Sequence, residues 1–387
     1  MSEGTSGNRL RLVLTALVAL AAALALAACG GDDTVGGGSD EPISVAEGGK
    51  ASGDVTISNW PGYIDPGNNG TVAEFEEESG VAVDYIEDIN DNVQFFGKLQ
   101  PQLDQGQSGG RSIFVVTDWM AKQMYDLGYL QEIDHESVPT VFENITSALE
   151  DSALDPGRKF SIPWQAGMTG IWVNTKQAPE IRSINDLFDP KYRGRVTFLT
   201  EMRDTVPLVM RGMGVEDTAN ATKEEWLAAI DKLDQAAQSG QIRRFTGNEY
   251  TEDLTAGNVV AAVGWSGDAS LIGTPDAEWR RPVEGCNLWA DNMVIPVGAP
   301  NTAAALEWMN FVYRPEVQAD IAAYVNYVTP VAGVAEILRQ KDPELAKNQL
   351  IFPSDEFTRD CQAQSEPPGS AQDQQEITEA FQDVVTG

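Results

Sequence analysis

Short apolar runs alternate with amphipathic segments along most of the chain, which predicts β-strands separated by helices. The first predicted elements are a strand over residues 55–58, a helix over Thr71–Ser79 and a strand over 81–86. The next are a helix over 95–103, a strand over 113–116 and a helix that ends near Leu127. Because strands and helices alternate regularly, this region is expected to form a doubly wound α/β lobe.

A second set of such elements begins near Gly167 and predicts a second lobe. Its main predicted elements are strands over 171–173, 196–200 and 259–265, with a helix over 223–237. The chain then crosses back near 289–296 and continues into predicted helices over 301–313 and 374–385. We expect residues 54–167 with 290–335 to form the first lobe, and 168–289 with 336–387 to form the second. Open α/β sheets bind ligands beyond the carboxyl ends of their strands, so a ligand cleft is expected between the lobes.

The beginning of the chain has the pattern of a targeting segment. Arg9 and Arg11 precede an apolar run over 12–28, which closes on Leu26-Ala27-Ala28 before Cys29. This order of positive charge, apolar run and small residues is typical of a signal peptide, here residues 1–28. The cysteine after the small residues resembles the lipobox of bacterial lipoproteins, in which the thiol is lipidated and the chain is cut just before it. An uncut membrane anchor is the alternative, but the run is only about as long as the shortest membrane spans.

Residues 29–53 are rich in Gly, Asp, Glu and Ser with few apolar side chains, and this predicts a flexible tether. The protein is therefore expected outside the cell membrane and anchored to it through a lipid on Cys29.

Composition narrows the function. The formal net charge of −33 excludes a general affinity for nucleic acid or anionic lipid surfaces. It suits a cationic ligand, although a solvated acidic surface is the commoner explanation of such a charge. His135 is the only histidine, so a catalytic triad or a histidine-rich zinc site is not expected, and no metal or cofactor is predicted. Cys286 and Cys361 could form a disulfide in an oxidising exterior, and their spacing leaves the pairing open.

Aromatic and acidic side chains recur at the predicted carboxyl ends of the strands. They are Trp60, Tyr63, Asp118, Trp119, Glu201, Asp204, Trp265, Trp289 and Asp291, with Thr117 beside Asp118. Indole faces attract ammonium groups by about 0.5–2 kcal/mol each, and carboxylates add charge-assisted hydrogen bonds, so this combination suits an alkylammonium chain. Each residue also has an ordinary explanation: Glu201 and Asp204, for example, lie in a first helical turn, where acids favour the helix dipole.

The chain from residue 54 onward resembles the spermidine/putrescine-binding proteins of polyamine ABC importers. The motifs that carry the resemblance are Asn59-Trp60 with Tyr63, Ser161-Ile162-Pro163-Trp164, Tyr192-Arg193-Gly194, Leu199-Thr200-Glu201, Glu284-Gly285, Trp289-Ala290-Asp291, and Tyr327 before Thr329-Pro330. Their order and spacing extend over nearly all of the chain after the predicted tether.

The resemblance implies a type II periplasmic-binding-protein fold whose two lobes close on one polyamine, spermidine or putrescine. By position, the aromatic walls would be Trp60, Tyr63, Trp119, Trp265 and Trp289, and the ammonium-binding acids Glu201, Asp204 and Asp291. Thr117, Tyr327 and Gln382 would make further contacts. Trp119 replaces a common tyrosine, and Glu201 and Asp204 exchange the usual acid lengths, which leaves the choice between diamine and triamine open.

The resemblance also implies a monomeric binding protein without enzymatic activity, whose partners are a membrane permease and its ATPase. Hinges would lie near 167–172, near 289–291 and around Ala335. The alternatives are a different solute, such as Fe³⁺, an anion or another organic cation, and a sensor that docks to a signalling receptor. A secreted hydrolase that uses Glu201 and Asp204 as paired carboxylates is a further alternative.

Overall fold

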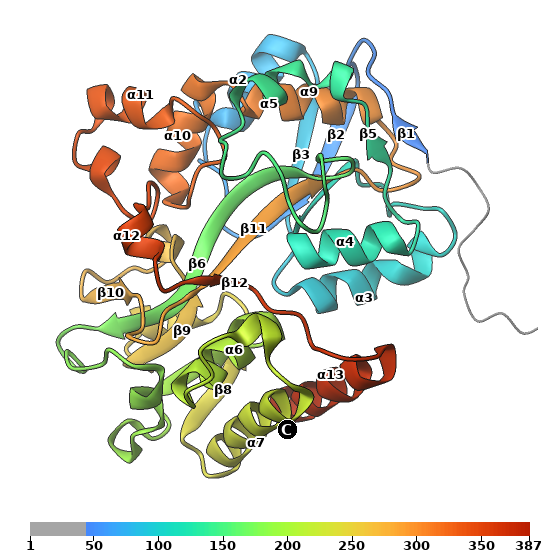
Figure 1. The fold of residues 1–387 in the computed structure, drawn as a ribbon. Coiled ribbons are helices and arrows are strands. Elements are labelled where there is room, and N and C mark those ends of the chain that lie inside the picture. The colour runs from blue at the N-terminus through green and yellow to red at the C-terminus, as the bar shows by residue number, and fades with distance from the viewer. Residues whose placement is uncertain (1–43) are drawn as a thin grey trace, which may run out of the picture. The chain divides into compact units, whose positions relative to one another are not determined.

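A mixed sheet of 10 strands runs through residues 44–387, the part of the chain that this computed structural model describes (Figure 1). The predicted signal peptide, Cys29 and the tether up to residue 43 lie outside the described residues. The rest of the predicted tether is not a free linker. Its strand β1 (Val45–Ala46) pairs with β5 (Glu132–Ile133), and Ala46 is buried, so the prediction of a flexible segment up to residue 53 is wrong at this end.

The first lobe is built on three parallel strands in the order β3-β2-β4. They are β2 (Asp54–Asn59), β3 (Ala82–Glu87) and β4 (Ile113–Thr117). The helices of this lobe are α2 (Thr71–Ser79), α3 (Asn92–Leu103), α4 (Asp118–Asp126), α5 (Pro139–Asn144), α9 (Thr302–Val312), α10 (Pro315–Val325) and α11 (Val334–Lys341). Local signals set their ends: α2 stops at Gly80, whose φ of 70° is left-handed, and Asp91 caps α3 by accepting from the Gln94 backbone N–H.

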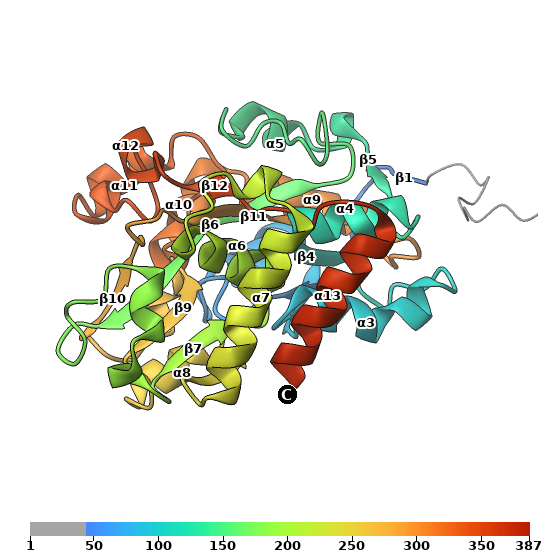
Figure 2. The same cartoon turned by 60° about the horizontal axis from the view of Figure 1, so that its bottom comes forward.

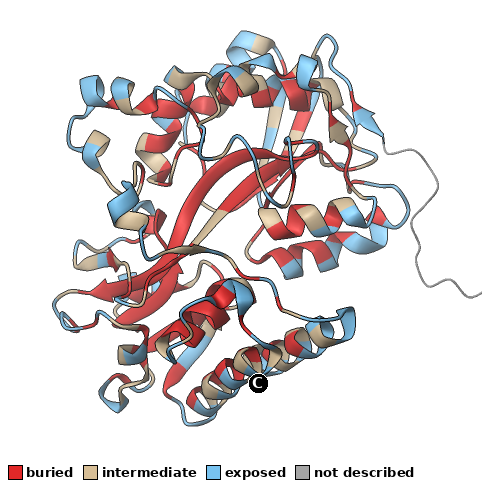
Figure 3. Cartoon of the chain, in the orientation of Figure 1, coloured by how far each residue is buried: buried red, intermediate tan, exposed pale blue. Residues whose placement is uncertain are grey.

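The second lobe has the parallel strands β7 (Val196–Leu199), β8 (Ile242–Thr246) and β9 (Ala261–Trp265). Its helices are α6 (Met202–Gly212), α7 (Lys223–Gln238), α8 (Tyr250–Thr255) and α13 (Ala371–Thr386). Figure 2 shows α7 and α13 packed side by side. In α7, Trp226, Ile230 and Leu233 are buried at helical spacing, as Figure 3 illustrates for the inner faces of the helices.

Two long strands, β6 (Ile162–Asn174) and β11 (Asn287–Val294), join the lobes into one sheet. β11 runs antiparallel to β4 through its last residues and to β6 along most of its length, and β6 continues antiparallel to β9. Gly167 leaves room for the Trp289 ring, which lies across it, because a Cβ at this position would lie 2.5 Å from that ring. The sequence predicted only residues 171–173 of β6, since all of its residues are buried and there is no alternation of buried with exposed positions.

The return to the second lobe occurs later in the chain than the sequence predicted. Ala335 lies inside α11, which packs on α10 in the first lobe, so the predicted hinge and boundary at this position are wrong. The chain instead passes through α12 (Asp355–Thr358) and β12 (Gln362–Ala363), which pairs with β11, before it reaches α13. Cys286 and Cys361 form a disulfide beside this pairing.

The short strand β10 (Ala277–Arg280) completes the sheet by pairing with β6. Within residues 44–387, no helix is both long and apolar enough to cross a membrane.

Candidate ligand-binding site

A cavity lies between the lobes, where the carboxyl ends of β2, β4, β7 and β9 meet. Its empty space is about 390 Å³, part of which is open to solvent. The residues that line it are Trp60, Pro61, Tyr63, Asn92, Thr117, Glu201, Asp204, Asn248, Trp265, Asp268, Trp289, Asp291, Tyr327 and Gln364. The predicted site residues except Asp118, Trp119 and Gln382 are thus brought together around one space.

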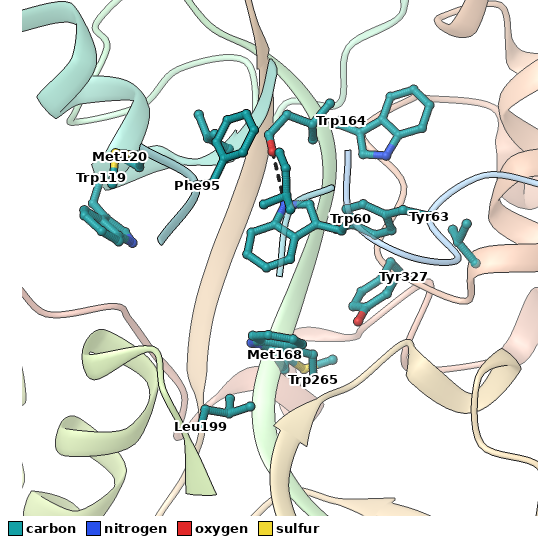
Figure 4. Close-up of a cluster of buried hydrophobic side chains, with 14 of the residues drawn as sticks. Trp60, Tyr63, Phe95, Trp119, Met120, Trp164, Met168, Leu199, Trp265 and Tyr327 are labelled. Atoms are coloured by element: carbon teal, nitrogen blue, oxygen red, sulfur yellow. Dashed lines mark hydrogen bonds between the residues drawn. The ribbon is translucent and has the colours of Figure 1, made fainter. Parts of the chain in front are cut away.

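Aromatic rings form the walls of the cavity. The Trp60 and Trp265 rings meet edge to face with centroids 5.7 Å apart, and the Tyr63 and Tyr327 rings do so at 5.0 Å. Trp289 lies against Tyr327 with a centroid distance of 5.5 Å. Figure 4 shows Trp60, Tyr63, Trp265 and Tyr327 gathered around the same region. The Trp60 indole N–H donates to the Val115 carbonyl at 3.1 Å, which fixes the ring against β4.

Asp291 lies on β11 directly opposite Thr117 on β4, and this register places its carboxylate in the cavity wall. Its two oxygens accept hydrogen bonds from the Thr117 hydroxyl at 2.7 Å and from the Tyr63 hydroxyl at 3.0 Å. Burial raises the pKa of Asp291 to about 7, and the two hydroxyls offset part of this effect. No Lys, Arg or His is among the described residues that line the cavity, so the carboxylate has no cationic partner there.

Asp204 lies in the first turn of α6 and is held by three donors. They are the Thr169 hydroxyl at 2.6 Å, the Trp265 indole N–H at 2.9 Å and the Gln364 amide at 2.7 Å. The Thr169 hydroxyl also accepts from the Trp289 indole N–H at 3.0 Å, so one threonine positions both an acid and an aromatic wall. Burial raises the pKa of Asp204 despite these hydrogen bonds.

Glu201 extends from the second lobe to the beginning of α3 in the first. One oxygen, Oε1, accepts from the Asn92 backbone N–H at 2.7 Å and from its side-chain amide at 2.9 Å. Burial raises the pKa of Glu201 well above its ordinary value, and the nearby carboxylates of Asp91 and Asp204 raise it further. Within the described chain, Oε2 of Glu201 accepts no hydrogen bond, so this oxygen is available to a ligand.

Asp268 is a fourth acid of the cavity that the sequence analysis missed. It accepts hydrogen bonds from the hydroxyls of Tyr250 and Tyr327, and burial raises its pKa to about 6. Asp268 could have been located from the sequence, because it comes three residues after Trp265, just beyond the same strand. The amide Asn92, which follows β3, is a second residue that this rule of strand ends would have found.

Trp119 and Gln382 do not line the cavity. Trp119 lies on α4 apart from the rings of Trp60, Trp265 and Tyr327 (Figure 4). The Arg203 guanidinium lies 3.7 Å from the Trp119 ring centroid. Gln382 lies on α13, which packs against α7. The glutamine of the cavity is Gln364, which the disulfide and the pairing of β12 with β11 hold near Asp204.

All the charged side chains that line the cavity are negative. Among the described residues that line it, four are acids and none is Lys, Arg or His. No cluster of three or more Asp, Glu, His or Cys residues within 44–387 is arranged to hold a metal ion. A dispersed set of carboxylates between aromatic faces can bind an organic cation that has several positive groups along an apolar chain.

Further hydrogen bonds join the lobes beside the cavity. The Thr200 hydroxyl donates to Asp91 at 2.7 Å, and the Asn90 amide donates to Glu249 at 3.0 Å. The Asn248 backbone N–H donates to Asn90 at 3.1 Å. The loop between β3 and α3 therefore contacts the strand ends of the second lobe directly.

Comparison with known proteins gives consistent results. The model of a family described as bacterial extracellular solute-binding protein matches residues 70–353. A spermidine/putrescine-binding periplasmic protein of Escherichia coli K12 is 27% identical over 314 residues, which cover 80% of this chain and 85% of that protein.

Solved structures are similar over the same region. A putative spermidine/putrescine ABC transporter from Listeria monocytogenes superposes with a TM-score of 0.73 and 28% identity, over 86% of this chain and 98% of that one. A lipoprotein of Treponema pallidum has the same fold, with a TM-score of 0.69 and 21% identity over 86% and 99% of the two chains. The predicted periplasmic-binding-protein fold is thus confirmed.

Proposed function

The chain belongs to the bacterial extracellular solute-binding protein family, and on this premise we propose that it captures a polyamine and delivers it to the permease of an ABC importer. Membership makes it an extracytoplasmic binding protein and not an enzyme. The motifs in its sequence resemble those of spermidine/putrescine-binding proteins, and the relatives found confirm this resemblance. Spermidine and putrescine are the proposed solutes.

The observation that carries this proposal is the set of four buried carboxylates between indole and phenol rings, without a basic residue among the groups that line the cavity. Burying carboxylates without cations is unfavourable, as the raised pKa values of Asp291 and Asp268 indicate. A ligand with ammonium groups would relieve this cost. Fe³⁺ and an anion are less suitable, because the described residues around the cavity include neither a metal-binding cluster nor a basic side chain.

Hydrogen-bonding capacity supports the same ligand. A carboxylate has about four lone-pair positions, and Asp291 uses one for each of its two hydroxyl partners. Oε2 of Glu201 has no partner in the described chain, so it can accept from an ammonium. The methylene groups between the ammonium groups would lie against Trp60, Trp265 and Trp289. These groups need no hydrogen-bond partner, and their contact with the indole rings removes apolar surface from water.

Calorimetric titration of the protein that begins at Gly30 tests the proposal. Spermidine, putrescine and a neutral amino acid are each titrated into it. Micromolar or tighter binding of a polyamine, with none of the amino acid, supports the proposed solute. Absence of heat with both polyamines would refute it, and agmatine and choline would then be titrated to find another organic cation.

The importer role needs a separate test, because a sensor that docks to a signalling receptor could use the same cavity. Cells that lack the gene are compared with the parent strain for uptake of radiolabelled spermidine and putrescine. Loss of uptake supports the importer role. Unchanged uptake together with tight binding in the titration would favour the sensor.

We also propose that Cys29 carries a lipid that anchors the protein to the cell membrane. The support is the Leu26-Ala27-Ala28-Cys29 motif in the sequence, and one relative of the same fold is described as a lipoprotein. Labelling cells with a palmitate analogue should mark the native protein and not the Cys29→Ser variant. Equal labelling of both proteins would contradict the proposed anchor.

A further inference from the structure

Trp119 already has a cation on its ring, and that cation comes from the chain itself. The Arg203 guanidinium lies 3.7 Å from the ring centroid. Arg203 is on α6 of the second lobe, whereas Trp119 is on α4 of the first, so the contact spans the two lobes. Trp119 is only 6% exposed, and within residues 44–387 its indole N–H has no hydrogen-bond partner. The Arg203 guanidinium is therefore the polar group that this ring contacts within those residues.

Arg203 is itself fixed by Glu366. Its Nε lies 2.9 Å from each carboxylate oxygen, and its Nη2 donates to Oε2 at 2.6 Å. The Arg203 side chain is 14% exposed. A planar guanidinium can use its edge for a carboxylate and its face for an indole at the same time, which a lysine ammonium cannot.

Both partners in the second lobe are close in sequence to cavity residues. Arg203 precedes Asp204, and Glu366 is two residues after Gln364, which donates to Asp204 at 2.7 Å. Trp119 is likewise two residues after the cavity residue Thr117. The contacts of Arg203 therefore lie beside the cavity wall without lining it.

We propose that Arg203 is a latch residue: it holds the lobes together beside the cavity and so slows ligand release. Separation of the lobes would pull α4 from α6 and break the stack on Trp119, whereas the pair with Glu366 would persist because it forms apart from α4. Arg203 itself binds no ligand in this proposal. The proposal rests on the proposed function only for the choice of spermidine in the second of its two tests.

The first test needs no ligand. Spin labels on Lys98→Cys and Gln238→Cys, two exposed positions on α3 and α7, report the distance between the lobes. Arg203→Gln should shift the distance distribution toward longer values. Arg281→Gln is the matched control, because Arg281 also forms an ion pair, with Asp360 at 3.2 Å, but does not stack on the first lobe.

The second test uses spermidine as the ligand and tryptophan fluorescence in a stopped-flow instrument. Arg203→Gln should raise the release rate by about 2- to 30-fold, the range that corresponds to one cation–π contact. Arg203→Lys should lie between the wild type and Arg203→Gln, since it keeps the charge but loses the planar stack. The thermal unfolding midpoint should change little, which separates a latch from a general contribution to folding.

The proposal is overturned if Arg203→Gln leaves both the distance distribution and the release rate as in the wild type. It is also overturned if Arg281→Gln has the same effects as Arg203→Gln. If the wild type binds no polyamine, the proposed solute fails, but the distances between the labels still decide the latch.

Discussion

Replacing Asp291 with Asn should weaken polyamine binding strongly while leaving the fold intact. Asn has the same shape, and its side chain can still pair with the Thr117 and Tyr63 hydroxyls that contact Asp291. What is lost is the negative charge of a side chain that is 4% exposed. The change therefore isolates the electrostatic contribution to binding.

The magnitude follows from the burial of this site. A hydrogen bond to a charged group contributes about 1.5–3 kcal/mol, against about 1 kcal/mol for a neutral pair. Two unit charges about 4 Å apart attract by about 4 kcal/mol at the effective dielectric constant near a protein surface. A net loss of about 2–4 kcal/mol is expected, which corresponds to a 30- to 700-fold rise in the dissociation constant.

Stability should move in the opposite direction. In the ligand-free protein, burial and the neighbouring acids Asp118 and Asp204 raise the pKa of Asp291 to about 7, so its charge is unfavourable there. Asp291→Asn should unfold at the same temperature as the wild type or higher. Asp320→Asn is the control, because Asp320 is an exposed acid on α10. It should change neither the polyamine affinity nor the unfolding temperature.

Calorimetry for affinity and thermal unfolding for stability decide this prediction. A change in affinity below threefold would refute the role of Asp291 as an ammonium-binding group. A loss of affinity accompanied by a large drop in stability would also refute it, since the effect would then come from structural damage.

Three further predictions follow from the same contacts. The folded-state pKa values of Asp268 and Asp291, about 6 and about 7, lie above the unfolded value, so the folded protein binds more protons between about pH 4 and 7. The ligand-free protein should therefore become more stable in thermal unfolding as the pH falls from about 8 to 5, while polyamine affinity falls; rising stability toward pH 8 would contradict this. Reduction of the disulfide between Cys286 and Cys361, 75 residues apart, should cost about 4 kcal/mol of stability, and an unchanged unfolding midpoint in reductant would contradict this. Trp265→Phe removes a wall of the cavity and the indole donor to Asp204, so titration should show affinity about 10-fold lower; an unchanged affinity would remove Trp265 from the site.

Much of the fold could be predicted because its signals are local. The helix Thr71–Ser79 agrees with the structure at both ends, since an apolar period and a terminal glycine define it. Strand β6 was recognised only in part, because a strand buried on both faces lacks the alternation that marks a half-buried one. The late return to the second lobe depends on the pairing of β12 with β11 and on a disulfide, which connect distant parts of the sequence.

In the candidate site too, local signals could be predicted from the sequence and contacts between distant segments could not. Residues at the carboxyl ends of parallel strands, such as Trp60 and Trp265, could be located because such strands place these ends together. Gln382 was expected from the resemblance alone, whereas Gln364 lines the cavity and nothing local in the sequence marks it. Trp119 could not be excluded from the cavity by sequence, since Arg203, which covers its ring, is distant in the chain.

A crystal structure of the protein with spermidine would test the central claim most directly. The account predicts the ligand in the cavity, with ammonium groups within hydrogen-bonding distance of Asp291 and of Oε2 of Glu201. Its methylene groups should lie against Trp60 and Trp265. Spermidine bound elsewhere, or bound in the cavity without contact to either carboxylate, would contradict the account.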